Sequence, residues 1–408
     1  MIDADCIESE SESDSESPAP PSQPRQAPPS LASLPLAVVD AFCGVGGVGI
    51  AARELGFGIR LAIDSDEDIL DLYQSNMGLK NASVLHRTIT DAVVDAEWPE
   101  AVPRLLLHWS APCQKLSRLN AHAVGQSDVA SAVRLFEAGV RLALRRGYQV
   151  FTLEQVNTTL TKQIAEEYKR RFPERVDWRV FCASEYGGAS TRSRLIISTP
   201  RVIELMRKHP KETSSAAKAF KEARVPLPDG ATHLKVTRSN GSGSASTVRP
   251  LSKPAPCVTA SHPLVFATCD GTSVAQQCCL TAKHSAALLG FPSNVRLPKL
   301  TRAAQRAVGN SLDVNFAKVM LSACATYVEE CAGAMPPPLD VGGLATLEPQ
   351  RAPVVAIAPA APAAAPPFPA KVNKRALLAM LDELEETAFK AATLGRKVRR
   401  ALDGLLEP

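Results

Sequence analysis

The stretch DAFCGVGGVG, from Asp40 to Gly49, connects a short apolar run to a segment with helical periodicity. The apolar run at residues 36–42 is expected to be a strand, and residues 48–55 are expected to be a helix. Glycines let the backbone turn sharply and approach a ligand closely, and a helix N-terminus presents free N–H groups. This strand–loop–helix context predicts a cofactor-binding loop, which we prefer over a purely structural turn.

The loop alone does not select the cofactor. Gly44, Gly46 and Gly49 satisfy the spacing G-x-G-x-x-G, and Asp64 lies 20 residues after Gly44, at the end of an expected strand over residues 59–64. An acidic residue at that point can accept hydrogen bonds from ribose hydroxyls. NAD, FAD and S-adenosylmethionine (SAM) fit this pattern about equally well.

Apolar runs alternate with helical segments through the centre of the chain. This alternation is typical of βαβ units and predicts an α/β fold with a doubly wound, mostly parallel sheet. Further strands are expected at residues 105–109, 150–154 and 195–199, and further helices at residues 67–76, 129–146 and 158–171.

Composition separates the ends of the chain from its centre. Residues 1–35 are acidic and then Pro-rich, with a net charge of −6, and are expected to form a disordered head. Residues 331–370 hold ten prolines and predict a Pro/Ala-rich linker. The overall charge is +4 and residues 331–408 carry +1, so residues 36–330 carry +9. A core with that excess suits a polyanionic partner.

Residues 371–408 carry a heptad pattern. Apolar residues step by four and three positions from Leu377 to Leu405, which predicts an amphipathic helix. The helix either docks on its own core or self-associates as a coiled coil. We place docking slightly ahead, because Gly395 costs about 1 kcal/mol of helix propensity.

Several classes of protein are excluded by composition. The sequence contains no run of 18 apolar residues, so we predict no transmembrane helix. The acidic N-terminal residues lack the apolar segment of a secretory signal. The ten cysteines contain no C-x-x-C pair, so we expect neither a disulfide scaffold nor a metal site. We therefore predict a reduced, intracellular protein without a membrane partner; nucleus and cytoplasm both stay open.

Side chains that could take part in catalysis lie beside the ends of three expected strands. Cys113 follows residues 105–109 in the segment Ser110-Ala111-Pro112-Cys113, Glu154 ends the next strand, and Arg192 and Arg194 precede residues 195–199. Open α/β sheets bind their substrates at this edge. The ordinary alternatives are a buried small cysteine, a charge at a helix N-terminus and a surface ion-pair site.

Together and in this order, these residues resemble the DNA (cytosine-5) methyltransferase family. Asp64, Asp66 and Tyr73 have the family's spacing after the second strand. Later segments are also similar to family motifs: Arg249 with Pro254-Ala255-Pro256-Cys257-Val258-Thr259 to R-x4-P-x-x-T-I-T, Leu280-Thr281 with Leu289-Gly290-Phe291-Pro292 to L-T…L-Q-G-F-P, and Gly309-Asn310-Ser311 to G-N-[SA]. The resemblance covers residues 36–330.

The resemblance implies the fold of SAM-dependent methyltransferases with a small recognition domain. It implies methyl transfer from SAM to carbon 5 of a flipped cytosine through a covalent Cys113 adduct. Glu154 would protonate ring nitrogen 3, and Arg194, supported by Arg192, would contact oxygen 2. The implied SAM-binding residues are Phe42, Gly44, Gly46, Gly47, Asp64, Ser65, Pro112, Asn310 and Ser311.

The resemblance also implies an organisation of the core. Residues 36–199 would form the catalytic core and residues 249–330 would complete it. Between them, residues 200–248 would form a short target-recognition region with nine bases and four acids. Double-stranded DNA is the implied partner, and tRNA is an alternative because one branch of the family acts on RNA.

Some positions depart from the family pattern. Where the family has Asn, this chain has Gln155, and where the family has Pro-Gln it has Ala189-Ser190. Thr88 replaces an Asp, and Asp313 and Val314 replace prolines. The Cys, Glu and Arg trio is intact, so we expect an active enzyme. A catalytically decayed DNA-binding homologue is one alternative. A nicotinamide- or flavin-dependent oxidoreductase is another, although it explains only the glycine loop.

Overall fold

The computed structural model describes residues 36–79, 83–89, 98–116, 126–236, 248–260, 264–269, 274–331, 334–339 and 341. The chain divides into two units, and all described residues belong to the first, residues 1–349. The expected head at residues 1–35 and the heptad segment at residues 371–408 lie outside the described residues. None of the described helices is both long and apolar enough to cross a membrane.

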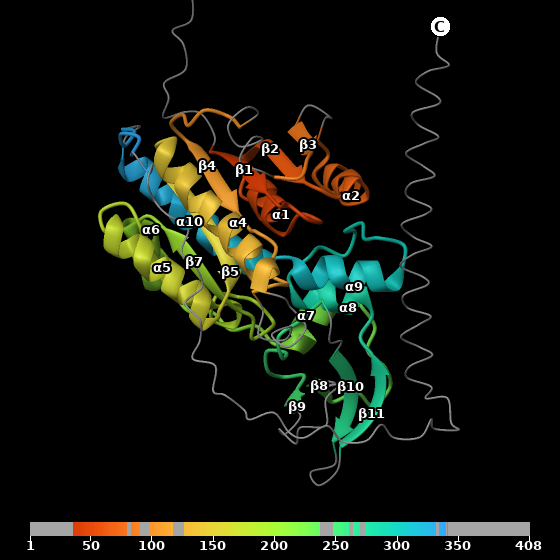
Figure 1. The fold of residues 1–408 in the computed structure, drawn as a ribbon. Helices are drawn as coiled ribbons and strands as arrows, with labels where there is room; N and C mark the ends of the chain where they lie inside the picture. Colours follow the sequence, from red (N-terminus) through yellow and green to blue (C-terminus); the bar gives the residue numbers. More distant parts are fainter. Residues whose placement is uncertain are drawn as a thin grey trace, which may run out of the picture. The chain divides into compact units, whose positions relative to one another are not determined.

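The first part of the chain alternates strands and helices (Figure 1). All strands and helices predicted there are found, and no end differs from its prediction by more than three residues. The prediction missed the short strand β3. The elements are β1 (Ala37–Ala41), α1 (Gly47–Glu54), β2 (Gly58–Asp64), α2 (Glu67–Met77), β3 (Val84–His86), β4 (Leu105–Trp109), α4 (Gln126–Arg145), β5 (Val150–Val156) and α5 (Thr159–Arg171).

The second part of the chain completes this sheet and builds a smaller one. Only β7 among these elements was predicted. They are β6 (Asp177–Cys182), the 3₁₀ turn η4 (Ala183–Glu185), β7 (Ser193–Ser198), α6 (Pro200–Lys208), α7 (Ala216–Glu222), β8 (His233–Val236), β9 (Val248–Pro250), β10 (Leu264–Cys269), β11 (Val274–Cys279), α8 (Ala282–Leu288), α9 (Thr301–Asn310) and α10 (Val314–Glu330).

The order of strands in the main sheet brings distant loops together. The seven strands run β3-β2-β1-β4-β5-β7-β6, and all neighbours are parallel except β7, which is antiparallel to β5 and β6. The order reverses between β1 and β4, so the loops after these strands leave the sheet side by side. Because β7 is antiparallel, its first residues lie at the end of β5, with Arg194 opposite Val156.

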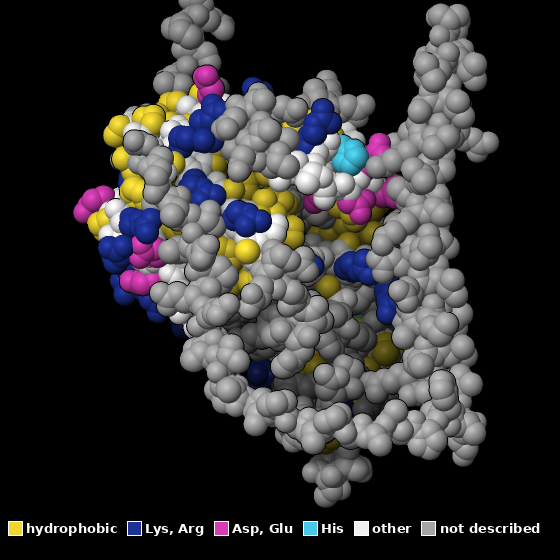
Figure 2. Space-filling view, in the orientation of Figure 1, with side chains coloured by type: hydrophobic (Ala, Val, Ile, Leu, Met, Phe, Trp, Pro, Cys, Tyr) yellow, Lys and Arg dark blue, Asp and Glu magenta, His cyan; other side chains and the backbone are white. Residues whose placement is uncertain are grey.

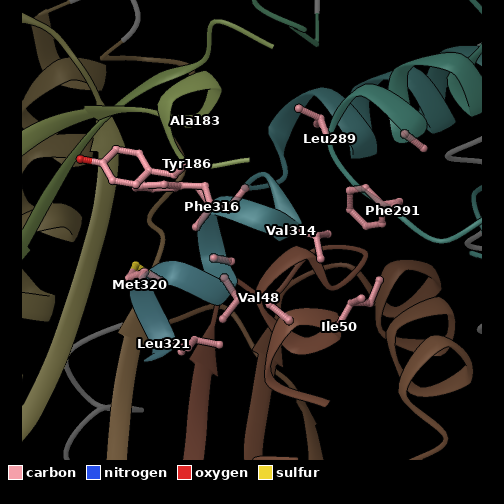
Figure 3. Packing of buried hydrophobic residues seen from close by; sticks show 14 of the residues in the cluster. Val48, Ile50, Ala183, Tyr186, Leu289, Phe291, Val314, Phe316, Met320 and Leu321 are labelled. Carbon is pink, nitrogen blue, oxygen red and sulfur yellow. The ribbon is translucent and has the colours of Figure 1, made fainter. Parts of the chain in front are cut away.

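Apolar layers cover both faces of the main sheet. The face that carries Val38 packs against α1, α6 and α10, and the face that carries Val39 packs against α4 and α5. Figure 3 shows Phe316, Met320 and Leu321 of α10 in the first of these layers, near Val48 of α1. A fully buried side chain of this size contributes about 1.5–3 kcal/mol, so α10 fixes the position of the residues at its N-terminus.

The smaller sheet is antiparallel, with the order β11-β10-β8-β9. Phe220 of α7 and Phe266 of β10 pack against His284 of α8 beneath it. Its strands come from residues 233–279 and therefore include parts of both segments 200–248 and 249–330. The limits predicted above for the catalytic core and the target-recognition region remain a proposal.

A row of polar side chains crosses the middle of the main sheet. Asp40, His108, Thr152 and Ser198 are register neighbours on β1, β4, β5 and β7, and each is at most 1% exposed. Tyr73 donates a hydrogen bond to Asp40 (3.0 Å), and His108 Nδ1 lies 2.9 Å from Thr152 Oγ1. Burial lowers the pKa of His108 to about 4. The folded protein therefore keeps His108 neutral at pH 7.

We predict that His108 makes the fold acid-sensitive. The unfolded chain protonates this histidine below about pH 6.5, whereas the folded chain does so only near pH 4. The free energy of unfolding should therefore fall by up to about 1.4 kcal/mol per pH unit between those values. Denaturant titrations from pH 4 to 7 should show a shallower slope for His108→Gln and an unchanged slope for the exposed-site control His209→Gln. Equal slopes in all three proteins would contradict the prediction.

Candidate active site

The glycine loop after β1 is tied to the end of β2. Phe42, Gly44 and Gly46 adopt φ values of 60, 54 and 99°. The Gly44 N–H donates to Asp64 Oδ2 (3.0 Å), and the Asp66 N–H donates to Asp64 Oδ1 (3.1 Å). Burial raises the pKa of the Asp64 carboxyl, and these N–H groups act against that rise. The Asp64 carboxylate therefore holds the glycine loop in place through the N–H of Gly44.

Two glycines of the loop have different surroundings. A Cβ at Gly47 would lie 2.5 Å from the carbonyl oxygen of Leu312, so this position requires glycine. A Cβ at Gly44 would meet no atom within 4 Å. Leu312 directly follows Gly309-Asn310-Ser311, so the glycine loop contacts the residue after the G-N-S segment on one side and borders open space at Gly44.

The other residues predicted to bind the cofactor surround this loop or the neighbouring one. The Phe42 ring packs edge-on against Trp109, with centroids 5.2 Å apart. Ser65 and Pro112 are exposed after β2 and β4, Asn310 is exposed at the end of α9, and Ser311 is half-buried. The structure thus gathers all nine predicted positions around the carboxyl ends of β1, β2 and β4 and the turn after α9.

This arrangement fits SAM. Both oxygens of Asp64 accept backbone N–H groups, and the carboxylate retains lone pairs that can accept hydroxyl groups of a ribose. The open space at Gly44 lets a ligand approach the backbone, and α1 directs its free N–H groups to the same region. These features suit a dinucleotide as well, so the choice of cofactor depends on the neighbouring residues.

A buried ion pair stands at the end of β5. Glu154 Oε1 lies 2.5 Å from Arg194 Nε, and Ser110 Oγ donates to Glu154 Oε2 (2.6 Å). Both residues are less than 10% exposed. Arg194 also donates to the carbonyl of Ser193. The loop after β4, the last part of β5 and the first part of β7 thereby meet at one carboxylate.

Arg192, just before β7, links this edge of the sheet to two motifs that come later in the sequence. Its terminal nitrogens donate to the carbonyl oxygens of Val258 (2.7 Å) and Gly309 (2.9 Å), and the residue is 2% exposed. Val258 belongs to the P-x-x-T-I-T-like segment and Gly309 to the G-N-S turn. Arg192 therefore holds both segments against β7.

Cys113 lies within electrostatic reach of this cluster. Burial raises the pKa of its thiol, Arg194 and Arg192 lower it, and Glu154 raises it. The thiol is therefore protonated at neutral pH in the ligand-free site. A change in the charge of Glu154 or Arg194 changes how readily the thiolate forms.

Two residues at this site were not among the predicted functional residues. Ser110 binds Glu154, as described above. Gln155, which departs from the family pattern, donates from Nε2 to the carbonyl of Ala111 (3.1 Å) and accepts the N–H of Val156 (2.8 Å). It thus fastens the loop that carries Cys113 to β5. Their positions at the ends of strands β4 and β5 were the available sequence signal.

The surface beside this site has a charge pattern. Figure 2 shows a hollow below α2, with acidic side chains over α2 and basic side chains over α9. The first turn of α2 carries Glu67 and Asp68, and α9 carries Arg302 and Arg306. Opposite charges therefore border the hollow.

A mostly parallel sheet with a glycine loop after β1 and a Cys–Glu–Arg cluster at the same edge is the arrangement that the sequence resemblance predicted for a SAM-dependent methyltransferase. A profile of C-5 cytosine-specific DNA methylases matches residues 36–245, just over half of the chain. The chain belongs to this family. The predicted fold class and enzyme class are confirmed, and the oxidoreductase alternative has no support.

Solved structures show the same fold. A prophage-encoded protein from E. coli, described as a DNA modification methyltransferase, shares 15% identity with a TM-score of 0.50, over 72% of this chain and 99% of that one. The Dnmt2 methyltransferase of S. pombe shares 16% identity with a TM-score of 0.50, over the same shares of the two chains. No curated protein sequence matches this chain.

We predict that the charges around Cys113 control its alkylation. Glu154→Gln should speed the reaction of Cys113 with iodoacetamide at pH 7, because it removes the charge that opposes the thiolate. Arg194→Gln should slow it, because it removes a favourable charge. Peptide mass spectrometry across pH 6–10 would give the rates, with Cys331 of the same protein as internal control. Identical pH midpoints for Cys113 in all three proteins would refute this.

Proposed function

We propose that this protein transfers a methyl group from SAM to carbon 5 of a cytosine in double-stranded DNA, through a covalent adduct between Cys113 and carbon 6. Membership of the DNA methylase family supports the reaction class. The observation that carries the assignment of residues is the buried pair of Arg194 and Glu154, within electrostatic reach of Cys113. The resemblance assigns these three side chains to the reaction.

Cys113 is the proposed nucleophile. Carbon 5 of cytosine is a poor nucleophile, and addition of a thiolate to carbon 6 makes carbon 5 enamine-like. A covalent intermediate divides one difficult step into two easier ones. Arg194 and Arg192 favour the thiolate, so a substrate that engages Glu154 and weakens its opposing charge would favour it further.

Glu154 and Arg194 are proposed to stabilise the charge that develops on the ring. The adduct places negative charge over nitrogen 3 and oxygen 2. The proton that leaves the Cys113 thiol would pass through Glu154, held by Ser110 and Arg194, to nitrogen 3, and Arg194 would contact oxygen 2. Because both groups are already fixed and buried, little reorganisation is needed when the base enters.

The glycine loop and Asp64 are proposed to bind SAM. Bound SAM supplies a methyl group on a positively charged sulfur, which carbon 5 can take once Cys113 has added. Asp64 would accept the ribose hydroxyls, and the free N–H groups of α1 would face the polar part of the ligand. The sheet order places this loop beside the loop of Cys113.

The proposed substrate must leave the duplex. A stacked cytosine cannot reach Cys113, and flipping it out costs about a few kcal/mol. Neutralisation of phosphates by basic side chains supplies much of the binding free energy. The basic residues 200–248 remain our proposed target-recognition region, together with the basic side of the hollow at α9.

SAM, and not NAD, should bind at the site that contains Asp64. Asp64→Ala removes the acceptor for the ribose and releases Gly44, so the Kd for SAM should rise by about tenfold or more. Titration calorimetry with SAM and with NAD would measure this, with Asp71→Asn, an exposed carboxylate of α2, as control. Tight binding of NAD, or an unchanged Kd in Asp64→Ala, would argue against the proposed cofactor site.

The covalent adduct can be trapped. Release of Cys113 requires loss of the proton at carbon 5, and a fluorine at that position cannot leave as a cation. Duplex DNA with 5-fluorocytosine and SAM should therefore form a complex that survives denaturing electrophoresis. Cys113→Ala should abolish it, and Cys331→Ser, at the far end of α10, should retain it. Failure to trap wild-type protein that binds SAM and DNA would count against the adduct.

A further inference from the structure

Asn76, in the last turn of α2, binds two backbone segments that lie far apart in the sequence. Its Nδ2 donates to the carbonyl oxygen of Val45 (3.2 Å), in the glycine loop, and to that of Arg296 (3.1 Å), between α8 and α9. Its Oδ1 accepts the N–H of Arg296 (2.7 Å). Arg296 lies 220 residues after Asn76. We call this set of contacts among Val45, Asn76 and Arg296 the Asn76 bridge.

The Asn76 bridge depends on the chemistry of an amide. A primary amide has two N–H donors and one acceptor oxygen, and here the nitrogen serves two carbonyls while the oxygen serves an N–H. Toward Arg296 the amide makes a paired contact, because it binds both the carbonyl and the N–H of one residue. A carboxylate of the same size could not donate either bond, and an apolar side chain would lose all three. Asn76 is 9% exposed, so water cannot easily replace these partners.

The same part of α2 packs closely against the glycine loop. A Cβ at Gly46 would lie 2.7 Å from Met77 Cε, and a Cβ at Gly49 would lie 2.5 Å from the hydroxyl oxygen of Tyr73. Tyr73 is itself held by its hydrogen bond to Asp40 of β1. Surfaces packed this closely leave little room for one to shift without the other. The glycine loop and the second half of α2 therefore hold each other in place.

The other partner of Asn76 begins a basic stretch of the chain. Residues 293–312 contain four basic residues and no acidic ones. The first basic residue is Arg296 and the last is Arg306 of α9, so we call residues 296–306 the basic stretch. Figure 2 shows basic side chains over α9 beside the hollow. Because basic side chains that contact phosphates set the position of a protein on DNA, this stretch suits the DNA backbone.

We infer that Asn76 is a positioning residue for methyl transfer, which fixes the basic stretch relative to the glycine loop. The glycine loop would hold SAM and the basic stretch would hold the duplex, so their alignment decides how well the methyl donor meets the cytosine. A ligand that fixes Val45 also fixes the amide of Asn76, and through it the backbone of Arg296. The inference rests on the proposed function for its catalytic consequence only; the Asn76 bridge itself can be measured without turnover.

Hydrogen exchange followed by mass spectrometry tests the Asn76 bridge in ligand-free protein. Asn76→Ser should speed exchange in the peptides that cover residues 43–50 and 292–300, because it removes all three bonds. Asn76→Asp, which loses both donated bonds, should speed exchange at residues 43–50. Arg53→Gln is the matched control, because Arg53 donates to the backbone carbonyl of Asn76 and not to its side chain. Changes in both Asn76 variants no larger than those in Arg53→Gln would overturn the inference.

SAM provides a second test in the wild-type protein. SAM should slow exchange at residues 43–50 and also at residues 292–300, which are not among the proposed SAM-binding residues. In Asn76→Ser, SAM should slow exchange at residues 43–50 only. Protection of both segments in both proteins, or of residues 43–50 alone in the wild type, would overturn the inference. If SAM protects neither segment of the wild type, the proposed function fails, and the ligand-free comparison alone decides whether the Asn76 bridge exists.

Steady-state kinetics separate positioning from stability. At a temperature where every variant is folded, kcat of Asn76→Ser should fall on the order of tenfold, because the methyl donor and the base are no longer aligned. The Kd for SAM should rise by less than about threefold, because the bond between Gly44 and Asp64 still holds the loop. Arg53→Gln should keep both values near those of the wild type. An unchanged kcat in folded Asn76→Ser, or an equal fall in Arg53→Gln, would overturn the inference.

Discussion

The balance of charge at the edge where β5 meets β7 is the constraint on which the rest of the site depends. Arg192 and Arg194 are both buried there, and neither charge could remain without internal compensation. Glu154 compensates Arg194 directly. The antiparallel direction of β7 makes this arrangement possible, because it brings the start of one strand to the end of another.

The same edge organises the segments that are distant in sequence. Arg192 fastens residues near 258 and 309 to β7, and Gln155 fastens the Cys113 loop to β5. The close contact of Gly47 with Leu312 then joins the glycine loop to the turn that Arg192 holds. A ligand on the glycine loop and a base beside Cys113 would thus rest on one connected framework.

The sequence predicted β1, β2, β4 and β5 of the parallel part of the sheet well, because these strands are short, mostly apolar runs separated by amphipathic helices. It also placed Cys113, Glu154 and Arg194 at one edge, where β4 and β5 end and β7 begins. It did not predict β8 to β11, whose strands are short and partly exposed and therefore lack a clear period. Asp313 could be noticed only as a departure from the family pattern. Its burial depends on the packing of α10 against α1, which no local pattern encodes.

Transfer of labelled methyl from SAM to duplex DNA tests the central claim most directly, with tRNA and Cys113→Ala protein in parallel. The account predicts label in 5-methylcytosine of the DNA digest, and no label with Cys113→Ala. Label confined to tRNA would contradict the substrate. Undiminished transfer by Cys113→Ala, or no transfer by wild-type protein that binds SAM and DNA, would contradict the mechanism.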